Sequence, residues 1–361
     1  MDVTLDIKPL SEWGIPFAHT FMIAGPCSAE SEEQLLATAR ALKPQNIQLL
    51  RAGIWKPRTR PNSFEGVGSI GLDWLVAARE ETGIPVSVEV ANPKQVEECL
   101  EKGIDVLWIG ARTTPNPFAM QDIAQALKGV DIPVMVKNPI NADLQLWIGA
   151  LERLNLAGVK KLLAIHRGFS SYKQDLYRNQ PLWRLPLELK RMVPGIPLVC
   201  DPSHICGKRD LIYDVAQKAL DLLFDGLMIE VHADPEKALS DSKQQFDPAA
   251  FAKLVERLVF KTPTSNQTGY LESIRSLRDE IDGYDRKIIE LLALRMENAR
   301  EISVHKMKHN ISIFQPDRWD EVLKTRVNEA LEKGIREDFI VQLFQLVHEE
   351  SIRQQENVLV D

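Results

Sequence analysis

The chain has 361 residues, more than one hydrophobic core usually supports, so its length predicts about two domains. A formal net charge of -7 leaves no broad basic field, which argues against nucleic acid as a partner. No apolar run approaches the roughly 18 residues of a membrane span, and the N-terminal segment lacks the pattern of a signal peptide, so we expect a cytoplasmic protein with no membrane partner.

Residues 1–260 repeat one unit, a short apolar run followed by a loop and a helical pattern. The runs lie at residues 20–24, 47–50, 86–90, 106–109, 134–136, 162–165, 198–200 and 227–231. Eight such alternations over about 250 residues predict an α/β fold of the (β/α)8 TIM barrel type rather than an open doubly wound sheet. The first run is not followed by a GxGxxG motif, which weakens the dinucleotide-binding alternative.

Basic residues gather directly after several of the predicted strands. In a closed barrel the residues that follow the strands all face one mouth, where ligands bind. These cations are Arg51, Lys56, Arg58, Arg112, Lys137 and Arg167. Their combined charge is too large for one monophosphate, so we expect two anionic substrates, or one substrate with both a carboxylate and a phosphate.

A second group at the same mouth has the chemistry of a metal site. Cys27, His204, Glu230 and Asp241 follow the first, seventh and eighth strands, which become neighbours only when the barrel closes. A mixed set of sulfur, nitrogen and oxygen ligands suits Mn, Fe, Co or Zn better than Mg or Ca. Taken alone, Cys27 is more often a small buried apolar residue than a ligand. The four cysteines form neither a disulfide framework nor a CxxC pair.

The motifs at these strand ends resemble those of 3-deoxy-D-arabino-heptulosonate 7-phosphate (DAHP) synthase of the short type I form. They are KPRT at 56–59, GARTT at 110–114, VKN at 136–138, HRG at 166–168, DPSH at 201–204 followed by GKRD, and IEVH at 229–232 with Asp241 beyond it. The resemblance implies condensation of phosphoenolpyruvate with erythrose 4-phosphate on a divalent metal ion. The related 3-deoxy-octulosonate 8-phosphate synthase is the alternative, and KPRT argues against it.

The resemblance also implies a role for each matching residue. It implies that the metal ligands are Cys27, His204, Glu230 and Asp241. It also implies that Arg58 and Thr59 bind erythrose 4-phosphate. The phosphoenolpyruvate site is then Arg51, Lys56, Arg112, Lys137 and Arg167. Lys56 is either a proton donor to the new alkoxide or a plain phosphate anchor.

The sequence changes character after residue 260. A polar stretch with proline and glycine predicts a boundary, with a barrel domain at 1–262, a linker at 263–269 and a helical domain at 270–361. From Ile274 to His305, spacings of three and four predict one long helix whose seam packs on other helices. Two shorter helices are expected near 319–333 and 337–356, which gives a small all-α domain.

A cation interrupts that apolar seam. Arg295 occupies a seam position, and a buried cation needs a carboxylate or a bound anion as partner. Lys306 lies eleven residues further on near the same face, so the two side chains can hold a small dianion between them. Arg278 is about 25 Å from Arg295 along the axis, so a second chain must supply it if it belongs to this site.

The basic and polar residues of this region resemble the site of the all-helical chorismate mutases of the AroQ class. They are Arg278, Arg295, Lys306, Arg318, Ser351 and Gln355, and the segment LFQLVHEESIRQQ at 343–355 is the most specific part of the match. The resemblance implies the Claisen rearrangement of chorismate to prephenate in an intertwined dimer. Two positions depart from the family: Trp319 replaces an acidic residue and Gln315 replaces an aspartate.

Together the two resemblances predict a bifunctional enzyme of aromatic amino acid biosynthesis, a transferase joined to an isomerase and at least a dimer. The loops between the predicted strands are too short for an effector domain, so we expect prephenate, bound in the helical domain, to inhibit the condensation. The alternative is an octulosonate-type barrel with a helical oligomerisation or effector module that has no activity.

Overall fold

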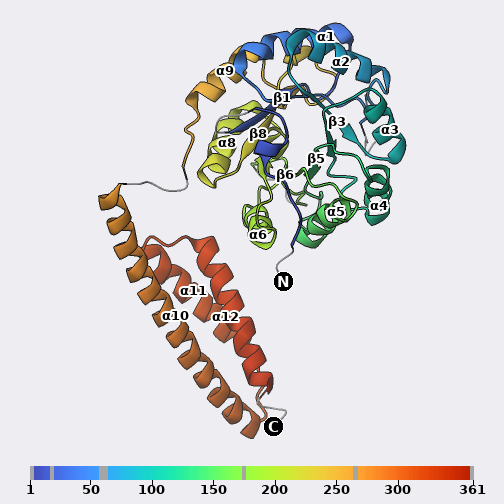
Figure 1. Ribbon diagram of the computed structural model, residues 1–361. Helices are drawn as coiled ribbons and strands as arrows, with labels where there is room; N and C mark the ends of the chain where they lie inside the picture. Colours follow the sequence, from blue (N-terminus) through green and yellow to red (C-terminus); the bar gives the residue numbers. More distant parts are fainter. Residues whose placement is uncertain (1–3, 17–19, 57–63, 173–175, 263–266, 358–361) are drawn as a thin grey trace. The chain divides into compact units, whose positions relative to one another are not determined.

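The computed structural model describes residues 4–16, 20–56, 64–172, 176–262 and 267–357. The chain divides into two compact units, Met1–Pro263 and Thr264–Asp361 (Figure 1). The first contains strands surrounded by helices, and the second is helical. None of the described helices is apolar over a stretch long enough to span a bilayer.

The first unit is a closed barrel of eight parallel strands in sequence order. The strands are β1 Phe21–Gly25, β2 Leu49–Arg51, β3 Val86–Val90, β4 Val106–Ile109, β5 Val134–Lys137, β6 Leu162–His166, β7 Leu198–Cys200 and β8 Gly226–Glu230. β1 and β8 close the barrel, with Phe21 beside Gly226 and Gly25 beside Glu230. The prediction of a TIM barrel followed by a small all-α region is confirmed, and every predicted strand lies within two residues of an observed one.

The closing seam depends on glycine. A Cβ on Gly226 would lie 2.1 Å from the carbonyl oxygen of Phe21, so no other residue fits this crossing. Gly25, at the end of β1, has a φ of +144°, and a Cβ there would lie 2.1 Å from the carbonyl oxygen of Arg51. The chain therefore turns tightly out of β1 against the end of β2 and carries Cys27 over the barrel mouth.

Helices surround the barrel (Figure 1). They are α1 Glu32–Leu42, α2 Ile70–Thr82, α3 Pro93–Glu101, α4 Pro117–Ala126, α5 Leu144–Leu156, α6 Arg184–Met192, α7 Pro202–Cys206, α8 Ile212–Asp221 and α9 Pro248–Arg257. Several begin with a side-chain cap: Ser31, Asn92 and Asp143 each accept a hydrogen bond from a backbone N–H of the first turn.

Two apolar layers hold the barrel together. One lies between the strands and the surrounding helices. The other fills the interior with side chains such as Ile23, Trp108 and Met228, and Leu10 and Trp13 of the N-terminal segment pack against it. Because the interior is solid, ligands have access only to the rim of loops at the carboxyl ends of the strands.

The second unit consists of α10 Thr268–Lys308, α11 Pro316–Glu332 and α12 Glu337–Asn357. Both α10 and α11 pack against α12. The sequence placed the start of the second helix near residue 319, but α11 begins at Pro316, because proline lacks an N–H and suits the first helical turn.

The seam of α10 is covered along only part of its length. Ala299 and Ser303 are buried, whereas Leu277, Ile281, Tyr284 and Ile288 are each 55–57% exposed. The expectation that the whole seam packs on other helices therefore fails within a single chain. α11 and α12, with 17 and 21 residues against 41 in α10, are too short to cover it.

Candidate active sites

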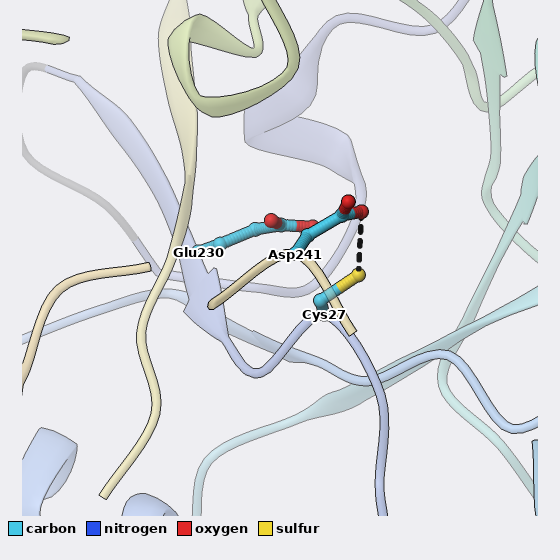
Figure 2. A group of neighbouring side chains, drawn as sticks. All are labelled: Cys27, Glu230 and Asp241. Carbon is cyan, nitrogen blue, oxygen red and sulfur yellow. Dashed lines mark hydrogen bonds between the residues drawn. The ribbon is translucent and has the colours of Figure 1, made fainter. Parts of the chain in front are cut away.

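Three metal-binding side chains converge at the mouth of the barrel. One ligand atom each of Cys27, Glu230 and Asp241 lies within 4.8 Å of the other two. Figure 2 shows the two carboxylates and the thiol turned toward one another, with Cys27 Sγ 3.3 Å from Asp241 Oδ2. Cys27 comes from the loop after β1, Glu230 ends β8, and Asp241 lies in the loop that follows β8. Closure of the barrel brings them together.

His204 faces this group from α7. Its Nε2 lies 3.7 Å from Glu230 Oε1, and its Nδ1 lies 2.8 Å from Asp201 Oδ2. Asp201 also caps α7 by accepting a hydrogen bond from the His204 backbone N–H, so one carboxylate fixes both the helix and the ring. Burial lowers the pKa of His204, which favours the neutral imidazole that binds metals.

The charges of the cluster suit a cation. Burial alone would raise the pKa of Glu230, but nearby positive charge, including that of Arg51 at 3.1 Å, lowers it, so the carboxylate is ionised. Burial, with Glu230 nearby, raises the pKa of Cys27 to about 12, so the thiolate forms only beside a strong positive charge. Glu230 Oε1 is buried and accepts no hydrogen bond from a described residue. These features fit a bound divalent metal ion.

Two residues that the sequence analysis missed orient these carboxylates. Arg178 Nη1 donates to Asp241 Oδ1 at 2.9 Å and to Gln244 Oε1 at 2.9 Å. Gln244 Nε2 in turn donates to Glu230 Oε2 at 2.7 Å. Each carboxylate therefore has one oxygen held from outside, while its other oxygen remains for the cluster.

Two of the predicted phosphoenolpyruvate-binding cations already have acidic partners, and a third contacts Cys27. Arg51 is 1% exposed, and its Nη1 lies 3.1 Å from Glu230 Oε1. Lys137 Nζ lies 2.9 Å from Asp201 Oδ2. Lys56 Nζ donates to the carbonyl oxygen of Cys27 and lies 3.2 Å from its Sγ. These contacts hold three of the cations close to the group formed by Cys27, Glu230 and Asp241.

The remaining barrel cations lie further out. Arg167 Nη1 donates to Asn179 Oδ1 at 2.8 Å. Burial, together with the nearby charges of Arg178 and Arg112, lowers the pKa of Arg167 to about 10, and Asp201 offsets part of this shift. Arg112 is exposed. The predicted erythrose 4-phosphate residues, Arg58 and Thr59, lie outside the described residues.

The helical unit contains a cavity of about 270 Å³ between its three helices. It brings together all but one of the predicted mutase residues: Arg295, Lys306, Arg318, Ser351 and Gln355. Arg295 donates to Ser351 Oγ, and Lys306 donates to the carbonyl oxygen of Ile313. Burial lowers the pKa of both cations. None of the described residues that line the cavity is acidic.

Arg278 is the predicted mutase residue that lies apart. It is exposed and does not line the cavity, as its position seventeen residues before Arg295 requires. The cavity also contains His348, which the sequence analysis did not single out, and Trp319. His348 lies within the segment 343–355 that carries the mutase resemblance, but it was not assigned a role, because a single histidine on a helix is usually a structural residue.

Known proteins match each unit separately. Residues 18–262 match the DAHP synthetase I family model. The chain belongs to the DAHP synthetase I family. Residues 277–356 match the model of chorismate mutase type II. The chain is therefore a bifunctional enzyme, with a DAHP synthase barrel and chorismate mutase helices. DAHP synthases depend on a metal ion, which agrees with the cluster at the barrel mouth.

Individual relatives support this assignment. The phospho-2-dehydro-3-deoxyheptonate aldolase of Thermotoga maritima is 32% identical over 237 residues, which are 66% of this chain and 68% of that protein. Its crystal structure gives a TM-score of 0.62 at 30% identity and covers 70% of this chain and 72% of that one. The 2-dehydro-3-deoxyphosphooctonate aldolase of Nitrosococcus oceani is 28% identical over 271 residues, 70% of this chain and 93% of that protein. The octulosonate alternative is not favoured.

Proposed function

We propose that Cys27, His204, Glu230 and Asp241 hold the divalent metal ion of the DAHP synthase. The observation that carries the proposal is the convergence of a thiol and two carboxylates within 4.8 Å, with the ring nitrogen of His204 3.7 Å from one of them. Like-charged carboxylates this close are stable only with cations between or around them. The mixed donor set favours Mn, Fe, Co or Zn.

The remaining barrel residues bind and orient the two substrates. When bound, the metal supplies a Lewis acid that polarises the aldehyde of erythrose 4-phosphate. Arg51, Lys56, Arg112, Lys137 and Arg167 hold the carboxylate and phosphate of phosphoenolpyruvate, and Arg58 and Thr59 hold the sugar phosphate. A bond then forms between C3 of phosphoenolpyruvate and the aldehyde carbon, water adds at C2, and phosphate leaves. Lys56, beside Cys27, donates a proton to the new alkoxide oxygen, which becomes the hydroxyl of the product.

A cobalt-loaded enzyme tests the ligand assignment directly. We expect a thiolate-to-cobalt charge-transfer band in the wild-type protein, and we expect Cys27→Ser to lose it. Cys99→Ser is the matched control, because Cys99 is also buried but lies on α3. A band that survives in Cys27→Ser would contradict the assignment.

For the helical unit we infer that Arg295, Lys306 and Arg318 bind the two carboxylates of chorismate, with Ser351 and Gln355 as polar contacts. The reaction needs no covalent intermediate, only cations that hold the substrate folded and a donor at the ether oxygen as charge builds there. The cavity supports this role because no described lining residue is acidic, and Arg295 and Lys306 have no acidic partner among the described residues, whereas Arg318 pairs with Glu321 outside the lining.

A second copy of the chain completes this site. The exposed apolar residues Leu277, Ile281, Tyr284 and Ile288 lie on the same half of α10 as Arg278. Burying them against a partner removes apolar surface from water and brings the partner's α10 to the helical unit. The unit is thus a dimer in which each cavity receives Arg278 from the other chain.

Prephenate, the product of the helical unit, inhibits the barrel. We place the barrel domain at residues 1–262, the helical domain at 270–361 and a linker at 263–269, whose last two residues already belong to α10, and we infer that prephenate favours one arrangement of the two domains. A coupling free energy of about 1–3 kcal/mol corresponds to a 5- to 150-fold effect. Titrating prephenate against the condensation should show inhibition in the wild-type enzyme and none in Arg295→Ala. Equal inhibition of both would contradict feedback through the cavity.

A further inference from the structure

The mutase cavity contains a buried polar atom that no proposed role uses. His348 lies on α12 and lines the cavity. Its Nε2 is buried and has no hydrogen-bond partner among the described residues. An unpaired buried polar atom is costly, and native structures rarely leave one without a partner. Because the His348 side chain lines a ligand cavity, a bound ligand that reaches this nitrogen supplies the partner.

Aromatic contacts hold the His348 ring in one orientation. The ring stacks on Trp319 of α11, with centroids 4.1 Å apart and an angle of 14° between the planes. Phe314 packs against it at 5.9 Å. The ring is therefore held at the cavity wall on a rigid support rather than on a mobile side chain.

The surroundings also keep the imidazole neutral. Burial lowers the pKa of His348, and the nearby cations Arg295 and Lys306 lower it further. A neutral imidazole has one nitrogen that donates and one that accepts a hydrogen bond. Carboxylates in this cavity meet stronger partners in the cations, so the ring suits a neutral polar group of the ligand.

Chorismate carries such a group. Besides its two carboxylates and its ether oxygen, it has a hydroxyl on the ring carbon next to the ether carbon. A hydroxyl donor needs an acceptor, and no described lining residue is acidic; Gln355 Oε1, which is also buried without a partner among the described residues, already has a proposed role as a polar contact. We propose that His348 Nε2 accepts the hydrogen bond of the chorismate ring hydroxyl and that the stack on Trp319 positions the imidazole for this contact. The proposal rests on the assignment of this cavity as the chorismate site.

The test removes the nitrogen and the hydroxyl separately. His348→Phe keeps an aromatic ring for the stack but has no acceptor. Because the hydroxyl takes no part in the bonds that break and form, we expect KM for chorismate to rise about tenfold with kcat nearly unchanged. For the chorismate analogue without the hydroxyl, the wild-type enzyme and His348→Phe should have equal Kd values. An unchanged KM, or an equal loss of affinity for both ligands, would overturn the proposal.

Two further variants separate binding from folding. His348→Gln keeps a hydrogen-bonding side chain and should recover part of the preference of the wild-type enzyme for chorismate over the analogue. Trp319→Leu keeps the imidazole but removes its support, so the preference should weaken, and an undiminished preference would overturn the positioning role. If His348→Phe does not fold, as judged by its thermal transition, the wild-type enzyme alone still tests the proposal. Its Kd for chorismate must be about tenfold lower than its Kd for the analogue. Absence of mutase activity in the wild-type enzyme would instead refute the assignment of the cavity itself.

Discussion

The two candidate sites of this chain handle positive charge in opposite ways. In the barrel, Arg51 faces Glu230 at 3.1 Å and Lys137 faces Asp201 at 2.9 Å, so the protein compensates its own buried cations. In the helical cavity, Arg295 and Lys306 donate only to neutral oxygens among the described residues, and of the three cavity cations only Arg318 has an acidic partner there, Glu321 at 2.7 Å. The barrel site is assembled before its ligands arrive, whereas the helical site relies on a ligand to balance its charge.

This difference follows from the fold that carries each site. A closed barrel places eight strand ends around one rim, so a single chain can bring Cys27, His204 and Glu230 together. A long helix spreads its residues along an axis, and Arg278 and Arg295 of one copy cannot reach a common ligand. The activity of the barrel site should therefore depend on a bound metal ion and on the hydrogen bonds that orient its ligands. The activity of the helical site should depend on anionic groups of its ligand and on a second chain.

The largest expected effect separates the sites completely. Cys27→Ala removes one of four proposed ligands and leaves two ionised carboxylates without their metal, so condensation should fall to background while mutase activity is retained. Initial rates of both reactions on one preparation measure this, with Cys99→Ala as the control. Normal condensation in Cys27→Ala would remove the thiol from the site.

Mixing two inactive variants tests whether the helical site needs two chains. Arg278→Ala and Arg295→Ala should each lose about 10²- to 10³-fold in mutase rate. In a dimer with two-fold symmetry, refolding them together at equal amounts should restore about one quarter of the wild-type activity, because half of the dimers then have one intact site. If the mixture stays inactive, Arg278 acts within its own chain or not at all.

A smaller effect is expected from the outer contacts of the barrel site. Gln244→Ala frees Glu230 Oε2 from its 2.7 Å hydrogen bond, so the carboxylate is less well oriented. Metal affinity, measured by competition with a chelating dye, should fall about 10- to 100-fold. The exposed Gln125→Ala on α4 is the matched control and should bind metal normally. Equal affinities for the two variants would exclude an orienting role for Gln244.

The smallest effect concerns the pH range of the mutase. Burial lowers the pKa of Lys306 from 10.5, so the side chain loses its proton, and with it its attraction for a carboxylate, at a lower pH than an exposed lysine. The kcat/KM of the mutase should therefore decline on the alkaline side at a pH below 10.5. Lys306→Arg keeps its charge and should move this decline upward. An identical profile in the variant would assign the titration to another group.

The sequence predicted the barrel well because its signals are local. Apolar runs such as 86–90 and 106–109 coincide with β3 and β4, and the order of the polar residues after the strands follows from the topology. The side chains that orient the carboxylates were not predicted. Arg178 lies between β6 and α6 in a segment without periodicity, and only the folded chain shows that it contacts Asp241.

The helical unit was harder to predict beyond its motifs. The spacing indicated a long helix, but it did not show which part of the seam α11 and α12 cover, since that depends on their length and crossing. The stack of His348 on Trp319 joins residues on different helices, and nothing in the sequence around either residue predicts the contact. Periodicity therefore predicts the helices themselves but not how they pack against one another.

The most direct test of the contrast is to assay both reactions on the same purified protein, before and after treatment with a metal chelator. The account predicts that chelation abolishes the condensation, that added Mn, Fe, Co or Zn restores it, and that the rearrangement of chorismate proceeds at the same rate throughout. A condensation that survives chelation, or a mutase that is lost with it, would contradict the division into a metal-dependent barrel site and a helical site that works through cations alone.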